Sequence, residues 1–232
     1  MATLAPQNSD GLNLEPYLRP TAFLDSDHPA VIDFAEKAVA GAATPREKAI
    51  RLYYAVRDGF IYDPYDLRLT PQDFRASYIV ERGKGFCVTK AGLLAAAGRA
   101  VGLPTRMGFG DVRNHLSTKK LLDLIGTDLF IFHGNTEFLL DGKWVKATPA
   151  FNLSLCQKFR VIPLEWDGVH DAIFHPKDED GRRHMEYVVD RGWRDDLPFD
   201  EIVTAFRAAY PKLYEGPADG DFAAEAEAEN AR

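Results

Sequence analysis

Apolar side chains recur at helical spacing in two early segments of the chain. The first segment opens at Pro29 and carries Ile32, Ala35, Ala38 and Val39 on one face. The second opens at Thr44, whose hydroxyl can cap a helix while Glu47 completes a capping box, and it ends near Gly59. Its apolar stripe comprises Ala49, Leu52, Tyr53, Val56 and Phe60. Both segments are predicted to be amphipathic helices that cover a core.

A third helical segment has a different character. The sequence CVTKAGLLAAAGRAV, residues 87–101, is small or apolar on almost every face, and Gly102 and Pro104 end it. A helix that is apolar nearly all round belongs in the interior of a domain. The turn-rich stretch before it contains one short helical candidate, FRASYIVERG. We therefore predict that residues 87–101 form the central helix of the fold.

The second half of the chain carries the β signal. TRMGFGDV predicts a strand, and STKKLLDLIG predicts a short amphipathic helix. Two apolar runs then flank Asp141-Gly142, a pair that suits a two-residue hairpin turn with positive φ. With that turn, Glu137 lies opposite Lys146, a favourable cross-strand charge pair, and Asn135 lies opposite Thr148.

The remaining segments complete the expected organisation. Residues 1–28 are predicted to be an irregular leader with room for one strand. Residues 29–214 are predicted to be one domain, with a loop-rich C-terminal extension that ends in the helix FDEIVTAFRAAYP. The acidic residues 215–232 contain few bulky apolar side chains, and we expect them to be a disordered tail.

Charge and cysteine content narrow the class of protein. The 232 residues carry a net charge of −7, which argues against a general nucleic-acid binder. No stretch approaches the roughly 18 apolar residues that span a bilayer, and the N-terminus has no basic start or apolar signal region. The two cysteines cannot build a disulfide scaffold. We expect a cytoplasmic protein that contacts neither nucleic acid nor membrane.

Cys87 is the first candidate for chemistry. It follows GKGF and opens the predicted buried helix, so its sulfur is expected near unpaired N–H groups and the positive end of the helix dipole. That position lowers the pKa of a thiol and favours the nucleophilic thiolate. The alternative is a structural core cysteine, because free cysteine is among the most buried residue types. Cys156, in a short helical stretch, is interpreted in that second way.

His133 is the candidate base. In the hairpin register it lies diagonally across from Thr148, within reach of an imidazole. A lone histidine after an apolar run is usually structural. Together with a cysteine at a helix start, however, His133 completes the arrangement of a nucleophile and its general base.

The two blocks GKGFCVTKAGLLAAAGRAVGLPTR and FHGNTEFLLDGKWVKATP resemble the transglutaminase-like superfamily, which shares a papain-like, cysteine-proteinase-like core. The resemblance covers roughly residues 40–155. It implies an α+β fold in which a Cys-bearing helix packs on an antiparallel sheet. It also implies that Cys87 is the nucleophile and that His133 is the general base and acid.

The third catalytic position departs from the family pattern. The chain has ATP where the family has VDP, so the acidic residue of the family falls at Thr148. Thr148 is the positional candidate for orienting His133, and Asn135 or Asn152 could substitute, because an uncharged orienting group serves papain-like enzymes. For the oxyanion, the backbone N–H of Cys87 is the first expected donor. The second donor stays open, with Gln72 and Tyr78 as candidates.

The function expected from this resemblance is that of a thiol enzyme acting on amide bonds through a Cys-linked acyl intermediate, with hydrolysis favoured over amine transfer. We expect no cofactor and no metal, and a protein, peptide or small amide as the substrate. The substrate-binding residues and the oligomeric state stay open. One alternative is a non-catalytic binding or scaffolding module that keeps the fold. Another is an acyl-CoA-dependent acetyltransferase.

Two polar clusters fall outside these motifs. One raises the question of a metal site, but it lacks paired ligand spacing and a full calcium-loop pattern, so we interpret it as a polar loop bordering the cleft. It comprises His170, Asp171, His175, Asp178, Asp180 and His184. The other cluster, DVRNHL, is interpreted as a turn that leads into the next helix.

Overall fold

A four-stranded antiparallel sheet forms the frame of the protein. The computed structural model describes residues 11, 13–175, 177–214 and 220–230. The strands lie in the order β5-β4-β3-β6. Their bounds are β3 Thr105–Asn114, β4 Leu129–Leu140, β5 Lys143–Ala147 and β6 Met185–Arg194. All three pairings are antiparallel, as the fold prediction required.

The hairpin between β4 and β5 has the register expected from the sequence. Asp141 and Gly142 both take positive φ, 50° and 78°, in the turn. Glu137 pairs with Lys146, and the pairing continues as far as Thr136 and Ala147. The turn residues and the charge pair were sufficient to predict the register. A shift of one residue would turn every side chain of the strand to the other face of the sheet, so the register is strongly specified.

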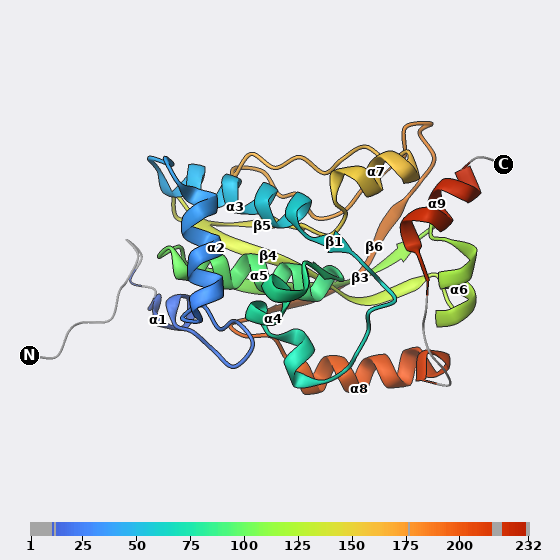
Figure 1. Ribbon diagram of the computed structural model, residues 1–232, viewed down its shortest axis with the longest axis horizontal. Coiled ribbons are helices and arrows are strands. Elements are labelled where there is room, and N and C mark those ends of the chain that lie inside the picture. The colour runs from blue at the N-terminus through green and yellow to red at the C-terminus, as the bar shows by residue number, and fades with distance from the viewer. Residues whose placement is uncertain (1–10, 12, 176, 215–219, 231–232) are drawn as a thin grey trace, which may run out of the picture.

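Helix α5, Cys87–Ala100, occupies the centre of the molecule, as predicted. Every residue from Cys87 to Arg99 is buried. One side of α5 packs on β4, where the Thr136 hydroxyl donates a hydrogen bond to the Ala91 carbonyl. Three helices pack around α5 on the side away from the sheet (Figure 1). They are α2 (Pro29–Val39), α3 (Pro45–Gly59) and α4 (Ala76–Arg82).

The buried Lys90 fastens α5 to its neighbours. Its side chain is fully buried, and Nζ donates to the carbonyls of Arg57, Phe60 and Ala150 at 2.9, 2.7 and 2.8 Å. Two of these carbonyls lie at the C-terminal end of α3, where orphan carbonyls and the helix dipole favour a cation. The third follows β5. Lys90 therefore ties the end of α3 and the segment after β5 to the central helix.

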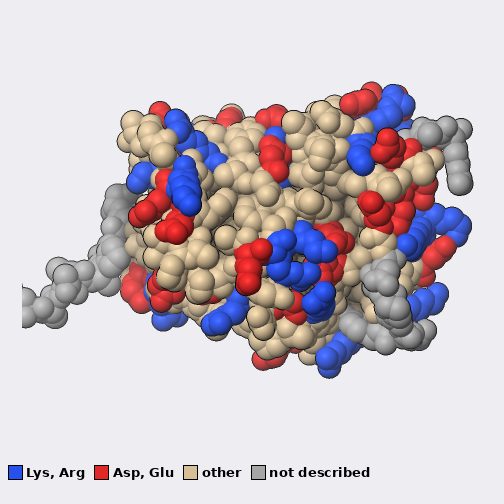
Figure 2. Space-filling model, viewed as in Figure 1, with Lys and Arg blue, Asp and Glu red and all other residues tan. Residues whose placement is uncertain are grey.

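Short elements surround this frame. They are α1 (Glu15–Leu18), β1 (Ile61–Tyr62), η1 (Pro71–Phe74), β2 (Lys84–Gly85), α6 (Lys119–Ile125), α7 (Leu153–Phe159), α8 (Phe199–Ala209) and η2 (Pro211–Tyr214). Strands β1 and β2 form a small parallel pair just before α5. Within the described residues, no helix is long and apolar enough to cross a membrane. Acidic and basic side chains are interleaved on the face shown in Figure 2.

The C-terminal region differs from the prediction in two elements. Strand β6 lies in the segment taken as loop, and it pairs with β3 from Met107 to Asn114, including Asp111–Asn114, which were interpreted as a turn. Helix α9, Phe222–Asn230, lies in the expected disordered tail. Its Phe222 side chain is buried against Tyr62 and Phe159, and this anchor holds an otherwise acidic helix on the domain. Of the expected tail, residues 215–219 and 231–232 lie outside the described residues, as do residues 1–10 and 12 of the leader.

Candidate active site

Cys87 is the first residue of α5, and local hydrogen bonds fix the start of that helix. The N–H of Phe86 donates to the Thr89 hydroxyl at 3.1 Å, and this hydroxyl lies 3.2 Å from the Phe86 carbonyl. The parallel pairing of β1 with β2 places Tyr62 alongside Gly85, two residues before the cysteine. The sulfur therefore sits at a rigid junction between the small β pair and the central helix.

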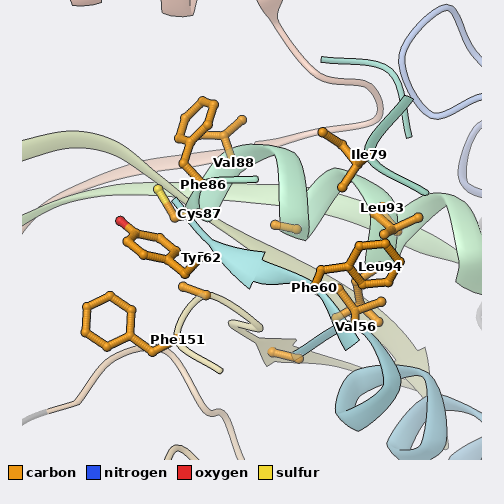
Figure 3. Close-up of a cluster of buried hydrophobic side chains, with 14 of the residues drawn as sticks. Val56, Phe60, Tyr62, Ile79, Phe86, Cys87, Val88, Leu93, Leu94 and Phe151 are labelled. Atoms are coloured by element: carbon orange, nitrogen blue, oxygen red, sulfur yellow. The ribbon is translucent and has the colours of Figure 1, made fainter. Parts of the chain in front are cut away.

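The surroundings of the thiol are apolar. Cys87 is 8% exposed and borders a small cavity of about 40 Å³. The cavity is lined by Tyr62, Pro64, Leu67, Phe86, Leu121, Ile125, Phe130, Ile131, Phe206, Tyr210 and Leu213. Figure 3 shows the Cys87 sulfur and the Tyr62 hydroxyl on the same side of this cluster. No lining residue carries an ionised side chain at neutral pH.

This apolar environment governs the protonation of Cys87. Burial raises the pKa of the thiol to about 11, while the N–H groups of Gly134, Val88 and Cys87 itself act to lower this pKa. The sequence-based expectation of a lowered pKa is therefore wrong for this geometry. The helix N–H groups contribute as expected, but loss of hydration of the thiolate is the larger effect.

Gly134 brings strand β4 against the start of α5. A side-chain Cβ at this position would lie 2.9 Å from Val88 Cα and 3.5 Å from the Cys87 carbonyl oxygen. Only glycine allows the two backbones to approach so closely. Because the Gly134 N–H also acts on the Cys87 thiol, the backbone of its neighbour His133 lies beside the cysteine.

His133 belongs to the opposite face of the sheet from the side chains that touch α5. Thr136 and Phe138 contact α5, whereas Glu137 reaches Lys146 on the outer face. His133 lies four residues before Glu137 in the same strand, so the two side chains share that outer face. Strand β5 pairs only with residues 136–140, so β4 has no β5 partner at His133. The imidazole is 6% exposed, and burial, together with His175, lowers the pKa of His133 to about 4. At neutral pH His133 is therefore an uncharged imidazole.

The three candidates for orienting His133 differ in the hydrogen bonds they make. The Thr148 hydroxyl and the Asn135 Oδ1 are both buried without a hydrogen-bond partner among the described residues. Asn152 is engaged elsewhere, because it accepts from the Tyr62 N–H at 3.1 Å and donates to Ser154 at 2.7 Å. Thr148 and Asn135 therefore have free polar atoms, and Asn152 does not. The catalytic roles of Cys87, His133 and Thr148 stay predictions.

The candidates for the second oxyanion donor lie elsewhere. Gln72 and Tyr78 line a separate cleft between the start of α2, η1 and α4, which shares no lining residue with the cavity at Cys87. Sequence reasoning did not single out Tyr62 as a donor, although its hydroxyl lies close enough to Cys87 for a thiolate to raise the pKa of Tyr62 further above the level set by burial. The pairing of β1 with β2 brings Tyr62 to the cysteine, and this long-range contact has no sequence signature.

The polar loop after β5 distributes its side chains among different partners. His170 pairs with Asp167, Asp178 accepts from Arg182, and Asp171 accepts from the Lys146 N–H. Asp180 pairs with Arg160. Within the described ranges, no three His, Cys, Asp or Glu side chains are grouped as metal ligands.

His175 and His184 are the two buried members of that loop. Their rings stack 5.7 Å apart, and both rings also lie against Phe151. His175 hydrogen-bonds the Ile162 carbonyl through Nδ1 at 2.8 Å, while both nitrogens of His184 are buried and have no hydrogen-bond partner in the described part of the chain. Since His175 affects the pKa of His133, the loop borders the candidate site from the outer face of the sheet.

Comparison with known proteins agrees with this architecture. One solved structure, described as "a Putative Cysteine Protease from Cytophaga hutchinsonii", superimposes with a TM-score of 0.51 at 17% sequence identity. The match covers 82% of this chain and 48% of the other, so the chain spans about half the length of that protein. At this identity the likeness shows a shared fold. No curated protein matches the sequence.

The family comparison is more direct. The family model of the transglutaminase-like superfamily matches residues 32–149, a range that runs from α2 to just beyond β5. It contains Cys87, His133 and Thr148 together with the helix and hairpin that carry them. The chain therefore belongs to the transglutaminase-like superfamily.

Proposed function

We propose that this protein is a thiol-dependent acyl hydrolase that acts on amide bonds through a thioester on Cys87, with His133 as its base and acid. The observation that carries the proposal is the contact between β4 and α5 at Gly134, which brings the backbone next to His133 against the nucleophile. A cysteine at a helix start beside a histidine is the arrangement of nucleophilic thiol catalysis. Membership of the transglutaminase-like superfamily supports the same chemistry.

The resting pair is uncharged, and this determines the first step. With the pKa of Cys87 raised to about 11 and that of His133 lowered to about 4, the thiol keeps its proton at pH 7 and the imidazole is free to accept it. As the sulfur attacks the amide carbonyl carbon, the S–H proton moves to His133. Proton transfer therefore accompanies attack, as in general-base catalysis.

The later steps follow from the same two groups. His133 returns its proton to the leaving nitrogen, the C–N bond breaks, and the acyl group remains on sulfur as a thioester. Water then attacks the thioester carbonyl while His133 accepts a water proton, and the carboxylic acid leaves as the Cys87 thiol is restored. We favour water over an amine as the acceptor.

The oxyanion requires donors beside the sulfur. The N–H groups of Cys87 and Val88 already act on the thiol at the start of α5, and they are suited to stabilising a tetrahedral oxyanion. We add the Tyr62 hydroxyl as a second type of donor. Burial raises the pKa of Tyr62 well above its usual value, so this hydroxyl stays protonated and able to donate.

The proposed substrate is a protein, peptide or small amide whose acyl portion next to the sulfur is uncharged. The cavity at Cys87 is lined by apolar and aromatic side chains, and a buried charge without a partner is strongly disfavoured. We propose that the side chains lining this cavity of about 40 Å³ move apart when a substrate enters. Action in the cytoplasm, without a cofactor, a nucleic acid or a membrane, is part of the proposal.

A non-catalytic binding module is the second candidate, and one observation favours it. Thr148 occupies the acidic position of the family motif, and a neutral hydroxyl stabilises an imidazolium less than a carboxylate does. The apolar cavity would then be the remnant of a substrate site. The two candidates differ in whether Cys87 forms a covalent acyl intermediate.

Acyl transfer from p-nitrophenyl acetate tests the proposal directly. A Cys156→Ala background removes the second thiol, which is buried in α7 away from the cavity. We expect a burst of p-nitrophenolate and a mass increase of one acetyl group on Cys87, both absent in Cys87→Ala. If the protein with Cys87 intact neither acetylates nor releases p-nitrophenolate above the Cys87→Ala level, the binding module is the better account. An acyl-CoA-dependent acetyltransferase would instead acquire the acetyl group from acetyl-CoA.

A further inference from the structure

Strand β4 contains one extra residue immediately before His133. Val112 pairs with Phe130 and Gly110 pairs with His133, so two steps along β3 face three steps along β4. An extra residue of this kind is a β-bulge, and it reverses which side chains face which side of the sheet. The bulge therefore decides that Gly134 faces α5 while His133 faces the outer side.

Phe132 is the residue that absorbs the bulge. Its φ is 52°, in the left-handed region that a bulky side chain rarely adopts, and it is 1% exposed. A conformation of this kind costs about 1–3 kcal/mol and persists only where the surroundings enforce it. The geometry beside His133 therefore depends on the groups that hold Phe132.

Asp111 and Arg191 hold Phe132 from two directions. The Phe132 N–H donates to Asp111 Oδ1 at 3.0 Å. Arg191 binds the same carboxylate through Nε at 2.5 Å and Nη2 at 2.8 Å, and its guanidinium lies 4.3 Å from the centre of the Phe132 ring. Asp111 is 4% exposed. One ion pair thus fixes both the backbone and the ring of the strained residue.

Tyr210 holds the other flank of the bulge. Its hydroxyl accepts the Ile131 N–H at 2.7 Å and donates to the Leu129 carbonyl at 2.9 Å. Tyr210 directly follows α8, whereas Asp111 is in β3 and Arg191 is in β6. Contacts from three separate elements therefore converge on residues 129–132 of a single strand.

We propose that the Asp111–Arg191 ion pair is a positioning device for His133, holding the bulge at Phe132 in the one conformation that places His133 on the outer face of β4, next to the contact of Gly134 with Cys87. The inference rests on the proposed function, because it assigns the pair an effect on chemistry through His133. A merely structural ion pair would affect stability without acting specifically through the histidine. Bulges next to active sites commonly re-aim a side chain in this way.

The test is a double-mutant cycle on the alkylation rate of Cys87 by iodoacetamide at pH 7 in the Cys156→Ala background. Asp111→Asn keeps an oxygen acceptor for Phe132 but removes the charge that holds Arg191. Because small misplacements of catalytic groups cost up to about 100-fold, we expect a roughly 10- to 100-fold slower reaction. In a His133→Asn background, Asp111→Asn should have no further effect. Asp111→Leu, which also removes the acceptor, should slow the reaction more than Asp111→Asn.

The matched control is Asp128→Asn. Asp128 also pairs with an arginine between β3 and β4, Arg113, but at a half-exposed position away from the bulge, and its substitution should leave the rate unchanged. Arg191→Lys carries the same test if Asp111→Asn does not fold, as judged by a thermal melt. It keeps the charge but loses the two-pronged contact, so a smaller decrease is expected.

The possible outcomes separate the two proposals. If His133→Asn slows alkylation and Asp111→Asn does not, or if Asp111→Asn has the same effect in both backgrounds, the positioning role is wrong and the proposed function stands. If His133→Asn itself leaves the rate unchanged, the proposed function fails and the positioning role fails with it.

Discussion

The two faces of strand β4 provide opposite environments for the two proposed reacting groups. On the inner face, Cys87 borders an apolar cavity in which burial keeps the thiol protonated. On the outer face, buried polar groups accompany His133, including the unpartnered atoms of Asn135 and Thr148. The difference shows that a single alternating strand can give a desolvated thiol and a polar imidazole separate environments on its two faces. The backbone of Gly134, next to His133, is where β4 contacts the start of α5.

The largest expected effect comes from disrupting the close contact between β4 and α5 at Gly134. Gly134→Ala would place a methyl group 2.9 Å from Val88 Cα, a backbone atom that cannot rotate away. Such overpacking costs about 1–3 kcal/mol and should push β4 from α5. We expect a loss of stability in a thermal melt and an approximately 100-fold slower alkylation of Cys87 at pH 7.

Gly59→Ala is the matched control for that substitution, because a Cβ there meets no atom within 4 Å. Its melting temperature and alkylation rate should remain near those of the unaltered protein. A Gly134→Ala protein that kept both properties would show that the close approach of β4 to α5 does not matter.

An intermediate effect is expected when the family's acid is restored on the outer face. We expect Thr148→Asp to place a carboxylate near His133, and a nearby opposite charge raises the pKa of a histidine by about 1–3 units. The alkylation rate of Cys87 should then fall away at a higher pH on the acid side than in the unaltered protein. The pH at half-maximal alkylation measures the shift, with Thr148→Val as the uncharged control. Equal midpoints in the two variants would show that the side chain at position 148 does not lie near His133.

The sequence predicted the elements around the site better than the environment of the site. The Asp141-Gly142 turn and the Glu137–Lys146 pair were sufficient for the hairpin register, and the apolar run after Cys87 was sufficient for the central helix. These features depend on local patterns. The raised pKa of the thiol was missed because it arises from residues far apart in the chain that close over one sulfur atom.

The C-terminal elements were missed for a related reason. Strand β6 lacks a clean apolar alternation, since Val188 and Val189 are adjacent and both exposed, and the strand forms through its pairing with β3. Helix α9 has little amphipathic character, and long-range contacts hold it, namely the buried Phe222 ring and the hydrogen bonds of Glu225 to Tyr65 and Thr118. Such tertiary contacts override local propensity.

The smallest effect concerns the stacked histidines that border the outer face. Burial lowers the pKa of His184 to about 3, below the unfolded value near 6.5, so the unfolded state binds the proton first as the pH falls. Stability should therefore decrease below about pH 6.5 and continue to fall towards the folded pKa. His184→Phe removes this proton and two unpartnered nitrogens, and it should retain about 1–2 kcal/mol more stability than the unaltered protein at pH 5.

Urea unfolding of both proteins at pH 7 and pH 5 measures that difference. If His184→Phe loses as much stability on acidification as the unaltered chain, the buried ring is not a source of the acid sensitivity.

The pH profile of Cys87 alkylation, with and without the histidine, tests the central claim most directly. In the Cys156→Ala background, the alkylation rate with iodoacetamide is measured over an experimental window of about pH 5.5 to 8. The rate should be nearly constant there, because a base with a pKa of about 4 is deprotonated throughout that range. With His133→Asn the rate should be about 100-fold lower at pH 7 and should rise with pH in proportion to the thiolate. Superimposable profiles for the two proteins would contradict the account.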